Sequence, residues 1–466
     1  MKNLVAGVDS STQSVKIVVC RASDGEVVRE ARASHPDGTQ VDPAAWWEAY
    51  HRIATDELLD GVEAIAVGGQ QHGMVALDEN GESVRDAVLW NDNGAAPDAL
   101  DLIKELGGPK AWADAVGTVP VASVTVSKLR WLQRVEPENA ARTASVLLPH
   151  DWLSWQLGGH TEAPATDRGD ASGTLYFDAT NNTYRDDLVR LALGHDLTLP
   201  RVAEPYEFIG ETPTGVKIAP GTGDNMAAAL GLNLQPGEAV VSLGTSGTAY
   251  TRTSEQTHDA VGTVCGFADA TGGFLPLVCT LNGARNLVRT AELLGVSLEA
   301  VSDLALSADP GAGGLTFLPY LAGERTPPLP EATGSLSGLT LDNMTPANLA
   351  RASVEGVLWS LAYGVQVMQE LTGPIKRLTL TGGAAQSPAV QRIAASVFGL
   401  PIAVTHAYES VAVGAARQAA ATLAQDQQLP DWPVPYSVET EPTEADRTAA
   451  AEISERYLAA LNREHR

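Results

Sequence analysis

Cysteine is scarce in this sequence, and its spacing argues against a covalent or metal framework. Only Cys20, Cys265 and Cys279 occur among 466 residues, and none of them belongs to a CxxC pair. An odd number of widely spaced cysteines disfavours a disulfide framework and a zinc site. Cys20 ends the apolar run at residues 17–19, so we interpret it as a small core residue.

Long apolar runs are absent as well. No stretch approaches the roughly 20 apolar residues that a membrane-spanning helix needs. Residues 1–3 lead directly into a strand-like segment, without the apolar region and cleavage site of a signal peptide. We therefore expect a cytoplasmic protein that has no membrane partner.

Positive charge is in short supply. The chain has 31 Lys and Arg against 57 Asp and Glu, which gives a formal net charge of −26. Nucleic acids and anionic membranes are bound through basic patches, so this composition disfavours both partners. The same field repels ATP at long range. An ATP site would therefore need local amide groups, hydroxyl groups and a metal ion.

The length and the apolar content predict an α/β protein with two cores. A single core rarely grows to 466 residues, and 44% of the residues are hydrophobic, which is enough for two. Strand-like runs at residues 64–67, 145–148 and 378–380 alternate with helical patterns such as the one at 390–398.

A turn-rich break lies near the middle of the chain. Residues 234–237 read Leu-Gln-Pro-Gly, which predicts one domain over residues 1–235 and another over residues 236–466. Each half opens with two short β-prone runs around a small polar loop, at residues 4–19 and 239–251. This pattern predicts a hairpin at the start of each half.

The loops of these hairpins have the composition of phosphate-binding turns, in which backbone N–H groups surround an anion. The first loop, residues 9–14, contains Asp9, whereas the second, residues 244–248, reads Gly-Thr-Ser-Gly-Thr and has no acid. A carboxylate beside phosphates suggests Mg²⁺, so we interpret Asp9 as a metal-side residue. An ordinary β-turn explains either loop taken alone. Neither loop matches the P-loop pattern GxxxxGK[ST].

Three further features lie where α/β proteins place ligands. Asp224 follows Gly-Thr-Gly at the start of a helical run, as an N-cap or as a presented catalytic group. His72 lies in a Gln-Gln-His-Gly turn after the strand at 64–67, where an open polar loop suits sugar hydroxyls. Gly382 and Gly383 separate a strand from a helix, which suits a ligand at a helix N-terminus. A cap, a core histidine and a tight turn are the ordinary alternatives.

Longer spaced motifs carry a resemblance to a known family. Residues 123–132 read Ser-x-Thr-x-x-Lys-Leu-x-Trp-Leu, and residues 334–355 contain Gly-x-Leu-x-Gly-Leu followed by Asn-Leu-x-x-Ala-Ser-Val-Glu. Both match signatures of the FGGY carbohydrate kinase family in residue type and spacing. Residues 317–327, with Gly-Glu-Arg-Thr-Pro, and residues 89–92, Leu-Trp-Asn-Asp, are most similar to the xylulokinases of that family. The resemblance covers nearly the whole chain.

The resemblance implies two ribonuclease H-like, actin-like ATPase domains with the active site in the cleft between them. It implies an ATP-dependent kinase that needs Mg²⁺ and phosphorylates a ketopentose, with D-xylulose as the first candidate. The sugar, the first phosphate loop and the base are expected in residues 1–235, and the nucleotide in residues 236–466. A homodimer is a further expectation from the family.

The resemblance also implies roles for individual residues. Asp224 matches the base that accepts the proton of the sugar hydroxyl, and Asp9 the acid of the first phosphate loop; both are expected at the metal. The sugar is expected to contact Gln71, His72, Trp90, Asp224 and Asn225. ATP is expected to contact Thr12, Gly244, Thr245, Gly382, Gly383, Ala384 and Ser387.

The sequence departs from the family pattern in places that bear on the substrate. The first loop reads Asp-Ser-Ser-Thr, with Ser11 where the family usually has Gly. Gln71 replaces a usual Met, and Asn93 replaces a frequent Gly. These departures leave the shape of the loop and the identity of the sugar open. Lys128 and Arg325 belong to the motifs but receive no role.

Other functions remain as alternatives. Within the kinases, another ketose or polyol, such as ribulose or glycerol, is an alternative acceptor. A non-catalytic actin-like ATP-dependent switch and a sugar-sensing pseudokinase belong to other classes. The presence of both Asp9 and Asp224 argues against these two.

Overall fold

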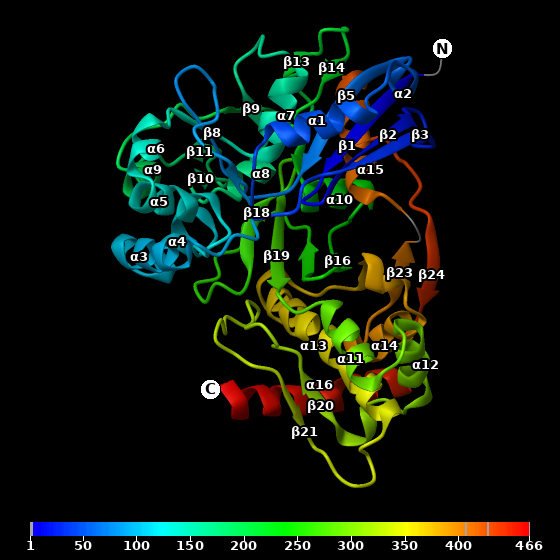
Figure 1. The fold of residues 1–466 in the computed structure, drawn as a ribbon. Coiled ribbons are helices and arrows are strands. Elements are labelled where there is room, and N and C mark those ends of the chain that lie inside the picture. Colours follow the sequence, from blue (N-terminus) through cyan, green and yellow to red (C-terminus); the bar gives the residue numbers. More distant parts are fainter. Residues whose placement is uncertain (1–2, 406–407, 426–427, 466) are drawn as a thin grey trace.

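Two large mixed sheets, each covered by helices, organise the chain (Figure 1). The computed structural model describes residues 3–405, 408–425 and 428–465. No helix in these described ranges is long and apolar enough to cross a membrane.

The first sheet has the strand order β13-β14-β5-β1-β2-β3, and β15 also pairs with β5. Its strands are β1 Leu4–Ser10, β2 Ser14–Arg21, β3 Val27–Ser34, β5 Val62–Gly69, β13 Gly210–Glu211, β14 Lys217–Ile218 and β15 Thr222–Gly223.

The second sheet has the order β18-β19-β17-β16-β22-β23-β24. Its strands are β16 Glu238–Leu243, β17 Gly247–Thr251, β18 Cys265–Ala268, β19 Phe274–Thr280, β22 Arg377–Thr381, β23 Ile402–Thr405 and β24 Tyr436–Thr440.

The two sheets repeat one arrangement. In the first, β1 and β2 form an antiparallel hairpin, and β5 and β14 continue in parallel to β1. In the second, β16 and β17 form the hairpin, and β22 and β23 continue in parallel to β16. The hairpins predicted at residues 4–19 and 239–251 are thereby confirmed. β1 and β5 are parallel neighbours, and so are β16 and β22. In such folds, ligands bind beyond the carboxyl ends of the parallel strands.

Helices and short strands fill the rest of the chain. The helices are α1 Ala44–Ile53, α2 Asp56–Leu59, α3 Ala96–Leu106, α4 Pro109–Val116, α5 Thr125–Val135, α6 Pro137–Arg142, α7 Pro149–Leu157, α8 Arg168–Ser172, α9 Asp186–Leu193, α10 Asp224–Gly231, α11 Arg285–Leu294, α12 Leu298–Ser307, α13 Pro346–Thr372, α14 Pro388–Phe398, α15 Ser410–Ala424 and α16 Glu444–His465, with 3₁₀ turns η1 Ala312–Gly314 and η2 Gly383–Gln386. The short strands are β4 Gln40–Val41, β6 Val75–Leu77, β7 Ala87–Val88, β8 Ser145–Leu147, β9 Ala165–Thr166, β10 Phe177–Asp178, β11 Thr183–Tyr184, β12 Arg201–Val202, β20 Thr316–Leu318 and β21 Ser335–Ser337.

Strands β1, β2 and β5 are buried on both faces of the first sheet, to which successive side chains of a strand point alternately. Val8 and Ile65 pack with Trp46 of α1 in one core cluster. Val5 and Ala64 belong to another cluster, together with the alanines of α15. β1 and β5 are therefore apolar at most positions.

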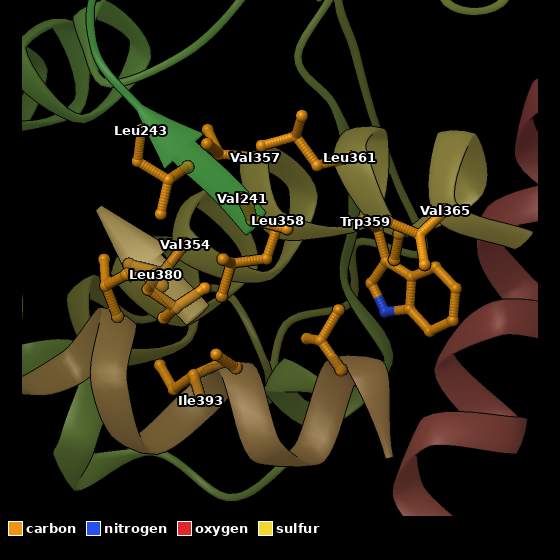
Figure 2. Close-up of a cluster of buried hydrophobic side chains, with 14 of the residues drawn as sticks. Val241, Leu243, Val354, Val357, Leu358, Trp359, Leu361, Val365, Leu380 and Ile393 are labelled. Atoms are coloured by element: carbon orange, nitrogen blue, oxygen red, sulfur yellow. The ribbon is translucent and has the colours of Figure 1, made fainter. Parts of the chain in front are cut away.

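The second sheet packs on α13 and α14. Val241, Leu243 and Leu380 from the strands meet Leu358 of α13 and Ile393 of α14 (Figure 2). α13 is 27 residues long, and it begins at a proline after Thr345, whose side chain accepts the backbone N–H of residue 348. Cap and proline together explain where this long helix begins.

α10 and α15 join the two halves of the chain. Met226 and Leu230 of α10 share a core cluster with Tyr250 of the second sheet. α15 lies between β23 and β24 of the second sheet in sequence, yet it packs on α10 and on β1 and β5 of the first sheet (Figure 1). The domain ranges 1–235 and 236–466 stay a prediction.

Candidate active site

The first sheet presents Asp9 and Asp224 at one edge. Asp9 is the next-to-last residue of β1, and it lies opposite Gly68 of β5. On the other side of β5, Thr222 of β15 also lies opposite Gly68, and α10 begins two residues later at Asp224. Two strand spacings, about 10 Å, therefore separate the backbones of β1 and β15 at this level. Asp9 and Asp224 therefore both lie at the carboxyl ends of strands of the first sheet.

Both carboxyl groups have raised pKa values. Burial raises the pKa of Asp224 to about 7, with further contributions from the negative charges of Asp9 and Asp170. Burial likewise raises the pKa of Asp9 to about 6, although Ser11 donates a hydrogen bond to its carboxylate. Each side chain keeps partial access to solvent. The two groups therefore lie deep in the protein but can still be reached from outside.

This pair fits a metal-bound phosphate donor. No cationic side chain of the described residues forms an ion pair with either carboxylate, so a divalent cation would relieve their mutual repulsion. Across residues 3–405, 408–425 and 428–465, no three His, Cys, Asp or Glu side chains are grouped as a metal site. Mg²⁺ characteristically takes one or two carboxylates and completes its shell with water and phosphate oxygens. Asp9 and Asp224 would supply the two carboxylates of such a site.

Asn225 connects Asp224 to its surroundings. The Oδ1 of Asp224 accepts hydrogen bonds from the backbone N–H of Asn225 at 2.8 Å and from its side-chain amide at 2.9 Å. The same amide donates to Gln71 Oε1 at 2.8 Å, and Asn225 Oδ1 accepts from Thr248 of β17 at 3.4 Å. Within the described part of the chain, Oδ2 of Asp224 has no such partner. That oxygen is available to a ligand.

Gln71 and His72 lie in the turn after β5, and Gln71 is linked to Asp224 through Asn225. His72 has φ of 65°, and its Nδ1 is 2.9 Å from the carbonyl oxygen of Gly173. Because a carbonyl can only accept, Nδ1 carries the hydrogen and Nε2 is an acceptor. Burial, with the charges of Lys128 and Arg325, lowers the pKa of His72 to about 3, so the ring is neutral.

Polar atoms without partners point to a ligand near this turn. Gln71 is buried, and its Nε2 has no hydrogen-bond partner among the described residues. A buried donor without a partner is costly, because it has lost its water. A sugar hydroxyl would satisfy this donor.

Thr12 and Trp90 contact each other. The indole N–H of Trp90 donates to Thr12 Oγ1 at 2.8 Å, and that hydroxyl lies 3.3 Å from Gln70 Oε1. Trp90 therefore lies against the first phosphate loop. Ser11 does not have positive φ, so the loop does not need the glycine that the family usually has there.

The predicted nucleotide residues gather at the corresponding edge of the second sheet. β16 and β22 are parallel neighbours, and Ser242 lies opposite Thr381. Gly244 and Thr245 therefore leave β16 beside the point where Gly382 leaves β22. Gly382 has φ of 86°, and a Cβ there would lie 2.7 Å from the oxygen of Leu243.

Gly383 and Ala384 follow in the 3₁₀ turn η2, which leads to α14. Ser387, just before that helix, places its hydroxyl 3.2 Å from Ser302 Oγ. The sheet thus brings Gly382, Gly383 and Ala384 close to the second loop, whereas the hydroxyl of Ser387 already has a protein partner.

Comparison with known proteins identifies the family. The N-terminal domain of the FGGY family of carbohydrate kinases matches residues 4–231, and its C-terminal domain matches residues 239–423. The chain belongs to this family. FGGY kinases use ATP with Mg²⁺, so this kinase takes MgATP as its phosphoryl donor.

Several relatives of this kinase match along most of their length. A xylulose kinase of Streptomyces coelicolor is 45% identical over 436 residues, covering 90% of this chain and 88% of its own. A xylulose kinase of Escherichia coli is 32% identical and covers 84% of both chains. The crystal structure of xylulose kinase from Bifidobacterium adolescentis is 43% identical, with a TM-score of 0.90 over 97% of this chain and 99% of that one. The predicted two-domain ribonuclease H-like, actin-like ATPase fold is confirmed.

Sequence reasoning missed buried ionisable residues that support the site of this kinase. Burial lowers the pKa of Lys128 to about 7, and its ammonium group donates to the carbonyl of His72 at 2.6 Å and to that of Ser123. Lys128 therefore holds the turn that carries His72. The motif at residues 123–132 marked this lysine, but no sequence signal reveals which carbonyl it contacts.

A second set of buried ionisable residues supports β15, the short strand that precedes Asp224. His150 Nδ1 is 2.6 Å from Asp170 Oδ2, and Asp167 Oδ2 accepts the hydroxyl of Thr222 at 2.8 Å. Burial lowers the pKa of His150, but neighbouring carboxylates outweigh it and raise that pKa to about 9. Through Thr222, this group holds the strand that leads to Asp224. The run Pro-His-Asp after β8 is the sequence signal that points to it.

A separate cavity lies outside this site. It has a volume of about 530 Å³ and is lined by residues of β2 and α15, including Arg21 and Ala421. None of the predicted site residues lines it. Its lining carries no acid that could serve as a base, so it does not compete with the site at Asp9 and Asp224.

Proposed function

We propose that this FGGY kinase transfers the γ-phosphoryl group of MgATP to D-xylulose and forms D-xylulose 5-phosphate. The observation that carries the proposal is the 45% identity to the Streptomyces coelicolor xylulose kinase along 90% of this chain. The geometry supports it, because the accessible carboxylate of Asp224 is linked through Asn225 to the buried amide of Gln71, and His72 lies in the same turn as Gln71.

Asp224 is the base in this proposal. As the terminal hydroxyl oxygen attacks the γ-phosphorus, the new O–P bond forms, the bond to ADP breaks, and the hydroxyl proton passes to the Asp224 carboxylate. A pKa of about 7 suits a base that works near neutral pH. Gln71, His72, Trp90 and Asn225 hold the sugar in this scheme.

The nucleotide would lie on the second sheet. Its phosphates would contact the loops at Thr12 and at Gly244 and Thr245, and its adenosine would lie near Gly382, Gly383, Ala384 and Ser387. Asp9 and Asp224 would hold Mg²⁺, which neutralises charge on the transferring phosphoryl group. In this scheme residues 1–235 supply the sugar site and the base, residues 236–466 supply most of the nucleotide site, and the active site lies in a cleft between them.

A substrate panel tests the proposal. Formation of ADP is measured with D-xylulose, L-ribulose, D-ribulose, gluconate, erythritol and glycerol, each with MgATP. We expect the highest kcat/KM with D-xylulose. A higher kcat/KM with another acceptor would identify that acceptor as the substrate in place of D-xylulose. ATP hydrolysis that does not depend on any sugar would favour the actin-like switch.

Partners and location follow from the substrates. We propose that the kinase works in the cytoplasm, where ATP is available, and that its partners are the sugar and ATP. The net charge of −26 disfavours nucleic acids and anionic membranes as partners. The homodimer stays a prediction, which light scattering of the purified chain tests.

A further inference from the structure

Arg325 brings a positive charge to the sugar side of the site. It lies in the segment between β20 and β21, in the second half of the chain. Its Nη1 donates to Ser123 Oγ at 3.3 Å, and its Nη2 lies 3.6 Å from Cys265 Sγ. Ser123 belongs to the first half, so the guanidinium reaches across to the segment before α5.

This segment supports the turn of His72. The carbonyls of Ser123 and His72 both accept hydrogen bonds from Lys128. The ring of His72 also lies 5.3 Å from that of Phe267, two residues after Cys265 on β18. Arg325 is therefore a neighbour of His72, which agrees with its effect in lowering the pKa of that ring.

The charge of Arg325 has no carboxylate partner. Among the residues that the structure describes, none forms an ion pair with it. The adjacent Glu324 is directed elsewhere, since it accepts the backbone N–H of Leu281 at 2.7 Å and the amide of Asn282 at 3.0 Å. A guanidinium has five N–H donors, and here they contact only neutral groups, the hydroxyl of Ser123 and the thiols of Cys265 and Cys279. This half-buried cation therefore lacks the carboxylate that usually offsets desolvation.

We propose that Arg325 binds the sugar by donating hydrogen bonds to the carbonyl oxygen of the ketose, and that it thereby favours ketoses over polyols. The proposal rests on the proposed function as a ketose kinase. The second half of the chain would then contribute a sugar-binding residue as well as the nucleotide site.

The chemistry of the neighbourhood supports this specificity. The Arg325 N–H groups can only donate, and the nearby Lys128 ammonium already donates to the carbonyls of His72 and Ser123. A carbonyl oxygen offers lone pairs and carries no hydrogen. A polyol hydroxyl at the same place would also have to direct its own hydrogen towards an acceptor, and a hydroxyl left without one is penalised. Ketone and alcohol are thus distinguished at one atom.

Steady-state kinetics of the full-length kinase test the proposal with Arg325→Met. We expect the KM for D-xylulose to rise about 10- to 100-fold, as for loss of a charge-assisted hydrogen bond, while kcat, the KM for MgATP and Tm change little. Arg325→Lys keeps the positive charge but loses the planar guanidinium group, so it should raise the KM for D-xylulose by a smaller factor. Arg289→Met removes an exposed arginine on α11 and serves as the matched control.

Inhibition by xylitol isolates the carbonyl. Xylitol has a hydroxyl where D-xylulose has its carbonyl, and each variant is assayed with D-xylulose at its own KM. We expect the same degree of xylitol inhibition in the wild type and in Arg325→Met. An equal loss of xylitol and D-xylulose binding would overturn the proposed specificity, and an unchanged KM for D-xylulose would overturn the sugar contact.

Two further outcomes are informative. A rise in the KM for MgATP alone would assign Arg325 to the nucleotide, and joint losses of kcat and Tm would assign it a structural role; either overturns the proposal. A wild-type kinase that does not phosphorylate D-xylulose contradicts the proposed function before any variant is compared. The two failures are therefore distinguishable.

Discussion

Asp224 combines a pKa near neutrality with one carboxylate oxygen that no described residue occupies. We predict that Asp224→Ala lowers kcat with D-xylulose by about 10²- to 10⁴-fold, the usual effect of losing a general base. The fold should be retained, because Asp224 lies at the start of α10 and contacts mainly Asn225.

Coupled ADP release and circular dichroism measure the two parts of this prediction. Asp303→Ala, on the exposed side of α12, is the matched control and should keep full turnover. Substantial turnover in Asp224→Ala would remove Asp224 from the role of base.

His72 makes the fold sensitive to acid. Its pKa is lowered from 6.5 to about 3, chiefly by burial. Below about pH 6.5 the unfolded chain binds a proton that the folded chain does not, so the free energy of unfolding falls as the pH falls. We predict that His72→Gln makes this fall shallower by about 1–2 kcal/mol between pH 6.5 and 5. Urea unfolding at several pH values measures it, and parallel curves for wild type and variant would contradict it.

Residue chemistry could be predicted only partly from the sequence. Asp9 follows an apolar run, so its place at the carboxyl end of a strand was predictable. Asp224 follows Gly-Thr-Gly, and its place near Asp9 depends on the short strand β15, which the sequence did not indicate. Lys128 and Arg325 were different. A lysine or arginine in a motif does not reveal whether carbonyls or carboxylates surround it, and here the answer depends on turns that are far apart in the sequence.

At the scale of elements, α10 and α15 approach each other at backbone distance. A Cβ on Gly414 of α15 would lie 1.8 Å from the oxygen of Ala227, and one on Gly231 would lie 2.0 Å from that of Ser410. The two contacts are reciprocal, because a glycine of each helix packs against the backbone of the other helix. Helices this close leave no room for a side chain.

We predict that Gly414→Ala lowers the free energy of unfolding by about 1–3 kcal/mol, because the helices must separate. Since α10 begins at Asp224, kcat should fall as well. Urea unfolding and turnover measure both effects. Gly158→Ala is the matched control, since its nearest contact would be an ordinary 3.6 Å. Equal stability of the two variants would contradict the close approach.

The strands and hairpins were predictable from apolar runs around small polar loops, and the structure confirms them at residues 4–19 and 239–251. The partner of α15 was not predictable. Residues 410–424 consist largely of alanine and other small residues, which mark a buried helix. A surface of small side chains fits many neighbours, and nothing in the pattern distinguishes the first sheet from the second.

The whole molecule carries a net charge of −26, and MgATP is also an anion. Like charges slow their encounter, and salt screens this repulsion, since the Debye length falls from about 30 Å at 0.01 M to about 8 Å at 0.15 M. We predict that kcat/KM for MgATP rises at least about twofold over that range. D-xylulose is neutral, so its kcat/KM at saturating MgATP provides the internal control. A fall with salt for MgATP would indicate a basic approach path instead.

The return of α15 to the first sheet affects how the nascent chain matures. Until residue 424 has left the ribosome, one face of that sheet, with Val5, Val18 and Ala64, has no cover. β1, which carries Asp9, is synthesised first, but the helix that packs on it is synthesised some 400 residues later, so this part of the core forms late. During this interval the growing polypeptide exposes apolar surface of the kind that chaperones bind.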